Sequence, residues 1–252
     1  MDIMPTLEIC AATLSGVEAA WRGGADRIEL CTSLETGGLT PSAGLVRAAR
    51  AVSARPLHVL VRPRAGDFHY TAAEQRLMLD DCRLAADLGA DGLVVGALTA
   101  DGAPHTGFLC AVRRAVPHLP LTLHRAFDFC RDPFAALEEA VDCGIACILT
   151  SGQAATAEAG IPLLRALRER AAGRLEIMPG CGVNPHNARR LLEATGCRAI
   201  HASAKAPHES AMTFRLRQTH TGLAAFDEYS WSDTSEQTVR LLAEAVHRNE
   251  AE

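Results

Sequence analysis

Glycine stands immediately before an apolar run at four places in this 252-residue sequence, within "RGGADRIEL", "LGADGLVV", "CGIACILT" and "TGCRAIHA". At each place the preceding residues have a helical pattern, so Gly24, Gly89, Gly144 and Gly196 occupy the position that follows a helix. Glycine is favoured there because it adopts the left-handed backbone conformation without a steric cost. The pattern therefore predicts helices that lead directly into buried strands.

Eight short apolar segments have the character of strands, and a helical pattern separates most of them. We expect these strands near residues 7–10, 27–31, 57–62, 92–96, 121–126, 146–151, 175–179 and 199–203. Alternation of strand and helix predicts right-handed βαβ units and a parallel sheet. Eight such units in about 250 residues predict an α/β fold, the closed eight-stranded (β/α)8 or TIM barrel. An open doubly wound sheet is the alternative, but "LEICAATLSG" lacks the G-x-G-x-x-G motif of that fold.

The predicted barrel accounts for about residues 5–205 of a single domain that spans residues 1–252. An irregular loop follows over residues 206–231, and a C-terminal helix is expected at about residues 232–249. A loop of that length is uncommon in a compact domain unless it is functional or disordered. We expect it to fold over the barrel mouth or to contribute to a contact between subunits.

Charge and cysteine usage exclude several classes of function. The net charge is -5 and the sequence has no basic block, which argues against nucleic acid or an anionic membrane as a partner. The opening "MDIMPTLEIC" does not resemble a signal peptide, and no apolar run approaches the roughly 20 residues that span a bilayer. Nine dispersed cysteines without a C-x-x-C pair indicate reduced thiols, and we expect a cytoplasmic protein.

Side chains alternate between the two faces of each predicted strand. The apolar face should contact the helices, and it comprises Leu7, Ile9, Ile28, Leu30, Val59, Val61, Leu121, Leu123, Ile200 and Ala202. The other face should point into the barrel, and it comprises Glu8, Cys10, Arg27, Glu29, Cys31, His58, Arg62, Thr122, His124, Glu176, Met178, His201, Ser203 and Lys205. An unpaired buried charge is costly. These residues must therefore pair with each other or line a hydrated pocket at the carboxyl ends of the strands, where this fold places active sites.

Five residues of this kind are candidates for catalysis: Glu8, Glu29, Arg62, His124 and Asp128. The carboxylates and the imidazole would supply general acid and base groups, and the arginine would bind an anion. The alternative is structural: a salt-bridge network that fills the barrel, with Asp128 as a helix cap. The sequence favours a site for the residues nearest the strand ends.

Three loops after late strands, "TSG", "GCG" and "HAS", carry small residues whose backbone N–H groups a ligand could approach. Anion binding by the loops after the seventh and eighth strands recurs in (β/α)8 enzymes. The predicted anion site comprises Ser151, Gly152, Gly180, Gly182, Ser203 and Lys205. The alternative reading of each loop is an ordinary tight turn.

The segments "LEIC", "GGADRIELC", "GGLTPS", "RPRAGDF-Y", "HRAFD", "LTSG", "GCGV" and "HASA", taken in order, resemble the copper homeostasis protein CutC family over nearly all of residues 5–205. The resemblance implies a cytoplasmic barrel that forms a homo-oligomer, a dimer or tetramer, and a role in copper tolerance with copper(I) binding. It also implies Cys10 and Cys31 as the metal ligands. One departure is Cys181 in "GCGV", where the family commonly has glycine; it adds a third thiol.

Copper(I) is a soft ion that prefers thiolate ligands. Cys10 and Cys31 end strands that are neighbours in a barrel, and strand spacing of about 4.8 Å would let two inward sulfurs meet. Against this, a buried cysteine commonly behaves as a small hydrophobic residue. Two other functions stay open: an enzyme of unknown reaction that acts on a small anionic or phosphorylated substrate at the carboxyl ends of the strands, and a non-catalytic scaffold.

Overall fold

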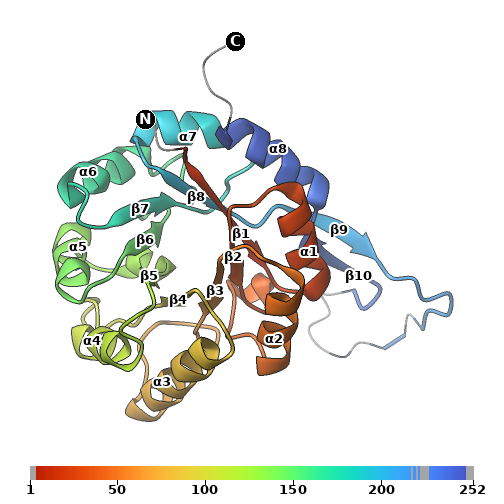
Figure 1. Ribbon diagram of the computed structural model, residues 1–252, viewed down its shortest axis with the longest axis horizontal. Coiled ribbons are helices and arrows are strands. Elements are labelled where there is room, and N and C mark those ends of the chain that lie inside the picture. Colours follow the sequence, from red (N-terminus) through yellow and green to blue (C-terminus); the bar gives the residue numbers. More distant parts are fainter. Residues whose placement is uncertain (1–3, 217, 220, 222–226, 248–252) are drawn as a thin grey trace.

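The computed structural model describes residues 4–216, 218–219, 221 and 227–247, and its core is a barrel of eight parallel strands inside a ring of helices (Figure 1). The strands are β1 (Thr6–Ala11), β2 (Arg27–Leu30), β3 (Leu57–Leu60), β4 (Gly92–Val95), β5 (Leu121–Leu123), β6 (Cys147–Thr150), β7 (Glu176–Pro179) and β8 (Ala199–Ala202). Their order in the sheet is β7-β6-β5-β4-β3-β2-β1-β8. Within these described strands, β7 and β8 are not joined by a hydrogen-bonded ladder, so the barrel is nearly closed. The predicted TIM barrel is confirmed.

The helices are α1 (Leu14–Gly23), α2 (Ala43–Val52), α3 (Ala72–Asp87), α4 (Thr106–Ala115), α5 (Pro133–Asp142), α6 (Ile161–Ala171), α7 (Ala188–Thr195) and α8 (Glu236–His247), with short 3-10 turns η1 (Leu34–Thr36) and η2 (Arg125–Phe129). Local sequence explains where they start: Thr71 and Glu74 form a capping box, and Asp132 accepts the first N–H groups of α5. Gly24 and Gly196 end α1 and α7 in the left-handed conformation, with φ of 94° and 69°. The part of the chain that the structure describes contains no helix long and apolar enough to cross a membrane.

The strands have the orientation that their alternation predicts. Leu7, Ile9 and Ile28 are fully buried in the hydrophobic core between the sheet and the helices. The opposite face carries polar pairs into the barrel, because register places Glu8 beside Arg27 and Cys10 beside Glu29. The layer between the sheet and the helices excludes water by apolar packing, whereas polar pairs inside the barrel are held by ion pairs and hydrogen bonds.

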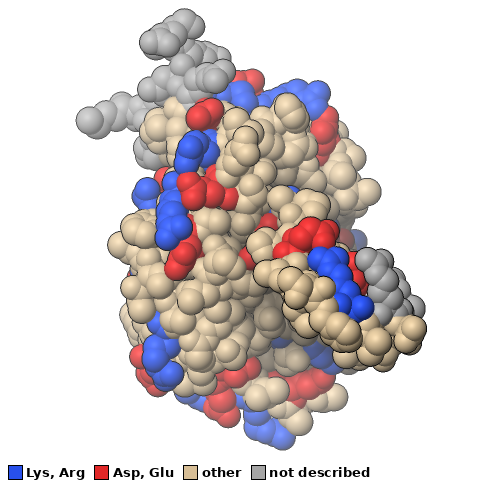
Figure 2. All heavy atoms as spheres, turned by 90° about the vertical axis from the view of Figure 1, so that its right-hand side faces the viewer, with Lys and Arg blue, Asp and Glu red and all other residues tan. Residues whose placement is uncertain are grey.

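Residues after the barrel form an arm that differs from the expected loop over residues 206–231. Strands β9 (Lys205–Glu209) and β10 (Ser230–Thr234) pair antiparallel, and the ring centroids of His208 and Trp231 lie 4.5 Å apart. The arm projects beside α1 in Figure 1 and stands clear of the barrel surface in Figure 2. Because residues 230–234 belong to β10, the last helix starts at Glu236 rather than near residue 232. Self-association stays a prediction.

Candidate functional site

A cavity of about 400 Å³ opens at the carboxyl ends of the barrel strands. We call it the mouth cavity. Strand-end and loop residues both contribute to its lining, which includes Cys10, Glu29, Arg62, His124, Cys181, Gly182, His201, Ser203 and Lys205. Active sites of (β/α)8 proteins lie at this end of the barrel, so this cavity is the candidate site.

Two sulfurs are in contact where Cys10 lines the mouth cavity. The Sγ atoms of Cys10 and Cys31 are 3.4 Å apart, and both residues are buried. Cys10 also donates a hydrogen bond to Glu29 Oε1 at 3.3 Å. Ligand atoms of Cys10, Glu29 and His201 all lie within 4.8 Å of one another. The structure therefore brings three potential donors to one point, a thiol, a carboxylate and an imidazole, and places the thiol of Cys31 against that of Cys10.

The protonation of this cluster follows from its burial. A hydrogen bond with Cys31, together with burial and the nearby charge of Glu29, raises the pKa of Cys10 well above its ordinary value. Burial raises the pKa of Glu29, with Glu8 acting in the same direction and His201 opposing it. Glu29 Oε2 is buried and has no hydrogen-bond partner among the described residues. Such an unsatisfied polar atom is costly unless something binds it.

An ion-pair network lies beneath the thiols. Glu8 is fully buried and accepts hydrogen bonds from Arg27 Nε and His201 Nδ1. Burial acts to raise the pKa of Glu8, but Arg27 and His201 outweigh it and hold that pKa well below its ordinary value. For His201, burial acts to lower the pKa, but Glu29 and Glu8 raise it above the ordinary value. Glu8 thus belongs to a structural network and does not line the mouth cavity.

His201 was not among the candidate site residues chosen from the sequence. It appeared only as one polar residue of the inward face of the last strand. The signal that could have singled it out is register, because β8 pairs with β1 and places His201 beside Glu8. That pairing joins the first and last strands of the barrel and has no counterpart in local sequence.

The His124 side chain lies in the wall of the mouth cavity with a fixed tautomer. Its Nδ1 accepts the N–H of Ala126, so the ring proton is on Nε2, which is buried without a hydrogen-bond partner among the described residues. Burial, and secondly the charge of Arg62, lower the pKa of His124 to about 3. A base is most effective when its pKa is near the working pH. In the free protein this neutral ring is suited to donating a hydrogen bond rather than to exchanging protons.

Backbone oxygens hold the Arg62 guanidinium. Its Nη1 donates to the carbonyls of Thr36 and Gly38, and its Nη2 donates to that of Gly66. The guanidinium carbon lies 5.0 Å from the centroid of the Phe68 ring. Arg62 makes no ion pair with a carboxylate in the described part of the chain, so its charge is available to an anion in the cavity.

Two glycines of strand β4 and its end create the space for the histidines. A Cβ on Gly92 would lie 2.5 Å from His58 Nε2, and a Cβ on Gly96 would lie 2.5 Å from His124 Cε1. No side chain fits there while the imidazoles keep their positions. The sequence "DGLVVGAL" contains this signal, because both glycines fall on the inward phase of the strand.

Asp128 lies in a different place from the catalytic candidates that line the cavity. Its carboxylate accepts hydrogen bonds from the N–H groups of Ser151 and Gln153 and from Arg125 Nε at 2.8 Å. It is also bonded to the Thr150 hydroxyl. These contacts hold the loop after β6 against η2, so Asp128 has a structural role in the free protein.

The six residues of the predicted anion site do not form one pocket. Gly182, Ser203 and Lys205 line the mouth cavity. The N–H groups of the other three already have partners: that of Ser151 binds Asp128, that of Gly152 binds the Thr150 hydroxyl, and that of Gly180 binds the Thr150 carbonyl. The loop after β6 is therefore a hydrogen-bonded turn, which was the alternative reading of "TSG".

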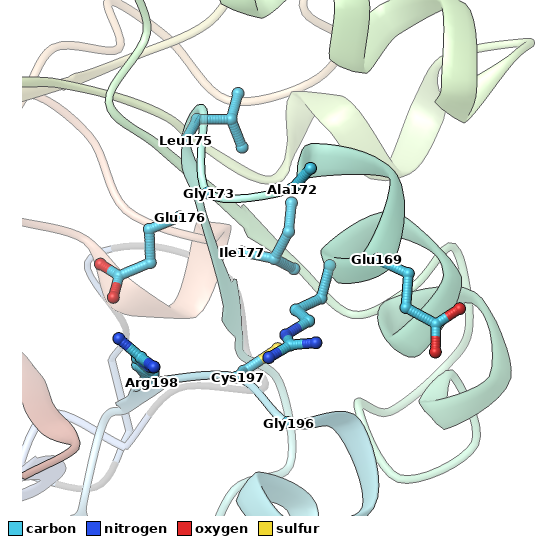
Figure 3. Close-up of a pocket in the computed structure, with 10 residues that line it drawn as sticks. Glu169, Ala172, Gly173, Leu175, Glu176, Ile177, Gly196, Cys197 and Arg198 are labelled. Carbon is cyan, nitrogen blue, oxygen red and sulfur yellow. The ribbon is translucent and has the colours of Figure 1, made fainter. Parts of the chain in front are cut away.

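A second cavity, of about 420 Å³, lies at the amino ends of β7 and β8, where these strands lack a ladder (Figure 3). Glu176 faces Arg198 across it, and burial raises the pKa of Glu176 despite the opposing charge of Arg27. Active sites are uncommon at this end of a (β/α)8 barrel, since the loops that carry the catalytic residues lie at the other end. The mouth cavity, which has both the soft donors and the unsatisfied polar atoms, is the stronger candidate.

Residues 5–206 match the CutC family. The chain belongs to the CutC family. A CutC family protein from Chromobacterium violaceum is 44% identical over 96% of this chain and 98% of its own length. A human relative named copper homeostasis protein cutC homolog is 41% identical over 96% of this chain and 89% of its own length. A crystal structure of the copper homeostasis protein CutC from Streptococcus agalactiae superposes with a TM-score of 0.76 at 32% identity, covering 79% of this chain and 99% of that one.

Proposed function

We propose that this CutC protein acts in copper homeostasis and binds copper(I) through Cys10 and Cys31. The observation that carries the proposal is the 3.4 Å separation of two buried sulfurs, one of which, that of Cys10, belongs to a residue lining the mouth cavity. Two thiolates suit a soft monovalent ion, and short separations are compatible with one ion bound between them. The names of the relatives support the homeostatic role.

The residues around the sulfurs have defined tasks in this proposal. Copper binds thiolates, so binding at Cys10 requires loss of the thiol proton. Glu29 accepts the hydrogen bond from Cys10, and its charge adds to the contact with Cys31 and to burial in opposing ionisation of that thiol. His201 is held by Glu8 at 2.8 Å, and Glu29 and Glu8 outweigh burial and raise its pKa, which favours the charged form of the imidazole beside the cluster. Cys181, which lines the same cavity, is a third thiol on the solvent side.

Competition with a chromogenic copper(I) chelator tests the site. The wild-type protein should withdraw one equivalent of copper(I), and Cys10→Ser and Cys31→Ser should each weaken this binding. Cys82→Ser is the matched control, since Cys82 is equally buried but lies on α3 away from the cavity. Unchanged affinity in the double variant Cys10→Ser/Cys31→Ser would reject the proposal.

A second candidate function is an enzyme that acts on a small anionic substrate. The specific observation in its favour is the part of the cavity lining where Arg62 lacks a carboxylate partner in the described chain and His124 Nε2 has no hydrogen-bond partner among the described residues. Ligand sites commonly combine such a cavity with a few convergent polar groups. Phosphate or sulfate should then raise the melting temperature in a concentration-dependent manner. A shift no larger than that given by matched chloride, or one retained in Arg62→Gln, would count against this function.

A further inference from the structure

A second pair of cysteines lies in the helical ring, outside the mouth cavity. Cys110 is on α4 and Cys143 caps the carboxyl end of α5, and these helices are neighbours in the ring (Figure 1). The two Sγ atoms are 3.0 Å apart. Among the described residues, the only other pair of sulfurs in contact is that of Cys10 and Cys31.

The surroundings of this pair differ from those of a metal site. Besides its contact with Cys110, the thiol of Cys143 donates one hydrogen bond among the described residues, to the carbonyl oxygen of Thr106 at 3.7 Å. Within the described chain, the cluster of potential metal-binding side chains is the one in the mouth cavity. No carboxylate or imidazole of the described residues forms a metal-binding cluster with these two thiols, so the pair is suited to oxidation rather than to holding a cation.

Access and distance both favour a bond between the sulfurs. Cys110 is partly exposed, whereas Cys143 is only 4% exposed. A disulfide bond is about 2.05 Å long, so the sulfurs must approach by about 1 Å. The partly exposed Cys110 has more freedom to make this movement than its buried partner.

We propose that Cys110 and Cys143 form a reversible disulfide that links α4 to the end of α5 in the presence of a low-molecular-weight disulfide. In a reducing compartment the pair remains two thiols. The inference is independent of copper binding, because neither cysteine lines the mouth cavity.

The reaction proceeds in two exchanges. The Cys110 thiolate attacks one sulfur of the small disulfide, the S–S bond of that oxidant breaks, and one small thiol leaves. The Cys143 thiolate then attacks Cys110 in the mixed disulfide and releases the second small thiol. Two electrons pass from the protein to the oxidant, and the two protein protons end on the two small thiols.

The order of attack follows from the environment of each sulfur. Burial and the contact with Cys110 raise the pKa of Cys143 to about 12, and Asp142 and Glu139 act in the same direction. Exchange requires a thiolate with access to the oxidant. The partly exposed Cys110 therefore reacts first, and Cys143 resolves the mixed disulfide.

Oxidised glutathione tests the proposal on the full chain. The wild-type protein should lose two hydrogen atoms by intact mass, and a non-reduced peptide map should join the peptides that contain Cys110 and Cys143. Cys143→Ser should instead retain one glutathione on Cys110, since the resolving thiol is missing. Cys110→Ser should show neither product. Cys181→Ser is the matched control, because Cys181 is also partly exposed but has no sulfur neighbour, and it should form the same cross-link as wild type.

Three outcomes would overturn the inference. Glutathione that persists on wild-type Cys110 would show that Cys143 does not resolve it. A cross-link between Cys10 and Cys31, or between any other pair, would show that the separation of 3.0 Å does not select this site. A wild-type protein that stays fully reduced at every tested ratio of oxidised to reduced glutathione would show that the pair does not form a disulfide.

Discussion

The two pairs of neighbouring sulfurs differ in what surrounds them rather than in how close they are. Cys10 and Cys31 are 3.4 Å apart, and Cys110 and Cys143 are 3.0 Å apart. In the first pair, the thiol of Cys10 lies within 4.8 Å of ligand atoms of Glu29 and His201 and lines a cavity of about 400 Å³. The second pair has one backbone carbonyl and a partly exposed member. Proximity of sulfurs is therefore not sufficient to define a metal site; the additional donors and the route of access decide the chemistry.

The largest expected effect is the difference in copper(I) affinity between variants that lack one cysteine pair or the other. Cys10→Ser/Cys31→Ser should weaken copper(I) binding by at least about 1000-fold, which exceeds the roughly 10–100-fold that a supporting residue around a metal contributes. Cys110→Ser/Cys143→Ser should bind copper(I) as tightly as wild type. Chelator competition on both double variants measures this difference. Equal losses in the two variants would abolish the distinction between the pairs.

The second expected effect concerns stability. Closing the disulfide between Cys110 and Cys143 should raise the free energy of unfolding by roughly 2–4 kcal/mol, because the cross-link restricts the unfolded chain. Denaturant titration of the oxidised and reduced proteins measures it. Cys110→Ser should show no difference after the same oxidation, and a lower stability of the oxidised wild type would mean that the link strains the contact between α4 and α5.

The third effect is the pH dependence of copper(I) affinity at Cys10 and Cys31. The pKa of Cys10 is raised, so below that pKa copper(I) must displace the thiol proton. Affinity should therefore rise with pH, by about tenfold per pH unit for each proton displaced. Chelator competition at a series of pH values, corrected for the chelator's own protonation, gives the slope. An affinity that is constant over neutral and alkaline pH would mean that the bound thiols are already ionised.

The smallest effect compares two carboxylates, one beside each pair. Glu29 accepts the hydrogen bond from Cys10, and Glu139 lies near Cys143 and raises its pKa. Glu29→Gln should strengthen copper(I) binding by less than about tenfold at neutral pH, since removing the charge makes the thiolate less costly. Glu139→Gln should leave the affinity unchanged. Weaker binding in Glu29→Gln would instead identify Glu29 as a ligand.

Much of the barrel could be predicted because its signals are local. Gly24 and Gly196 mark helix ends by their own backbone requirement, and period-two alternation assigns each strand residue to a face. The same alternation placed Cys10 and Glu29 inside the barrel before any contact was known. The arm was less predictable, since about twenty residues separate β9 from β10 in the sequence, far more than the two-residue loop of a short hairpin.

Asp128 and His124 were both predicted to be catalytic, but their hydrogen bonding in the structure differs. Both are polar and lie near the end of β5, so sequence reasoning assigned both to catalysis. The Asp128 carboxylate accepts hydrogen bonds from N–H groups of the next loop, whereas His124 Nε2 has no hydrogen-bond partner among the described residues. The difference depends on how two loops pack, which no residue spacing specifies.

By itself the sequence determined the eight-fold repeat, the inward and outward faces of the strands, and the placement of Cys10 and Cys31 at neighbouring strand ends. Only the tertiary structure brought His201 to Glu8, because the last strand must close against the first. It alone also brought Cys110 to Cys143, across 33 positions and two helices. The physical reason is that backbone periodicity is a short-range property, whereas the rotation of each helix against its neighbours is set by packing over the whole barrel.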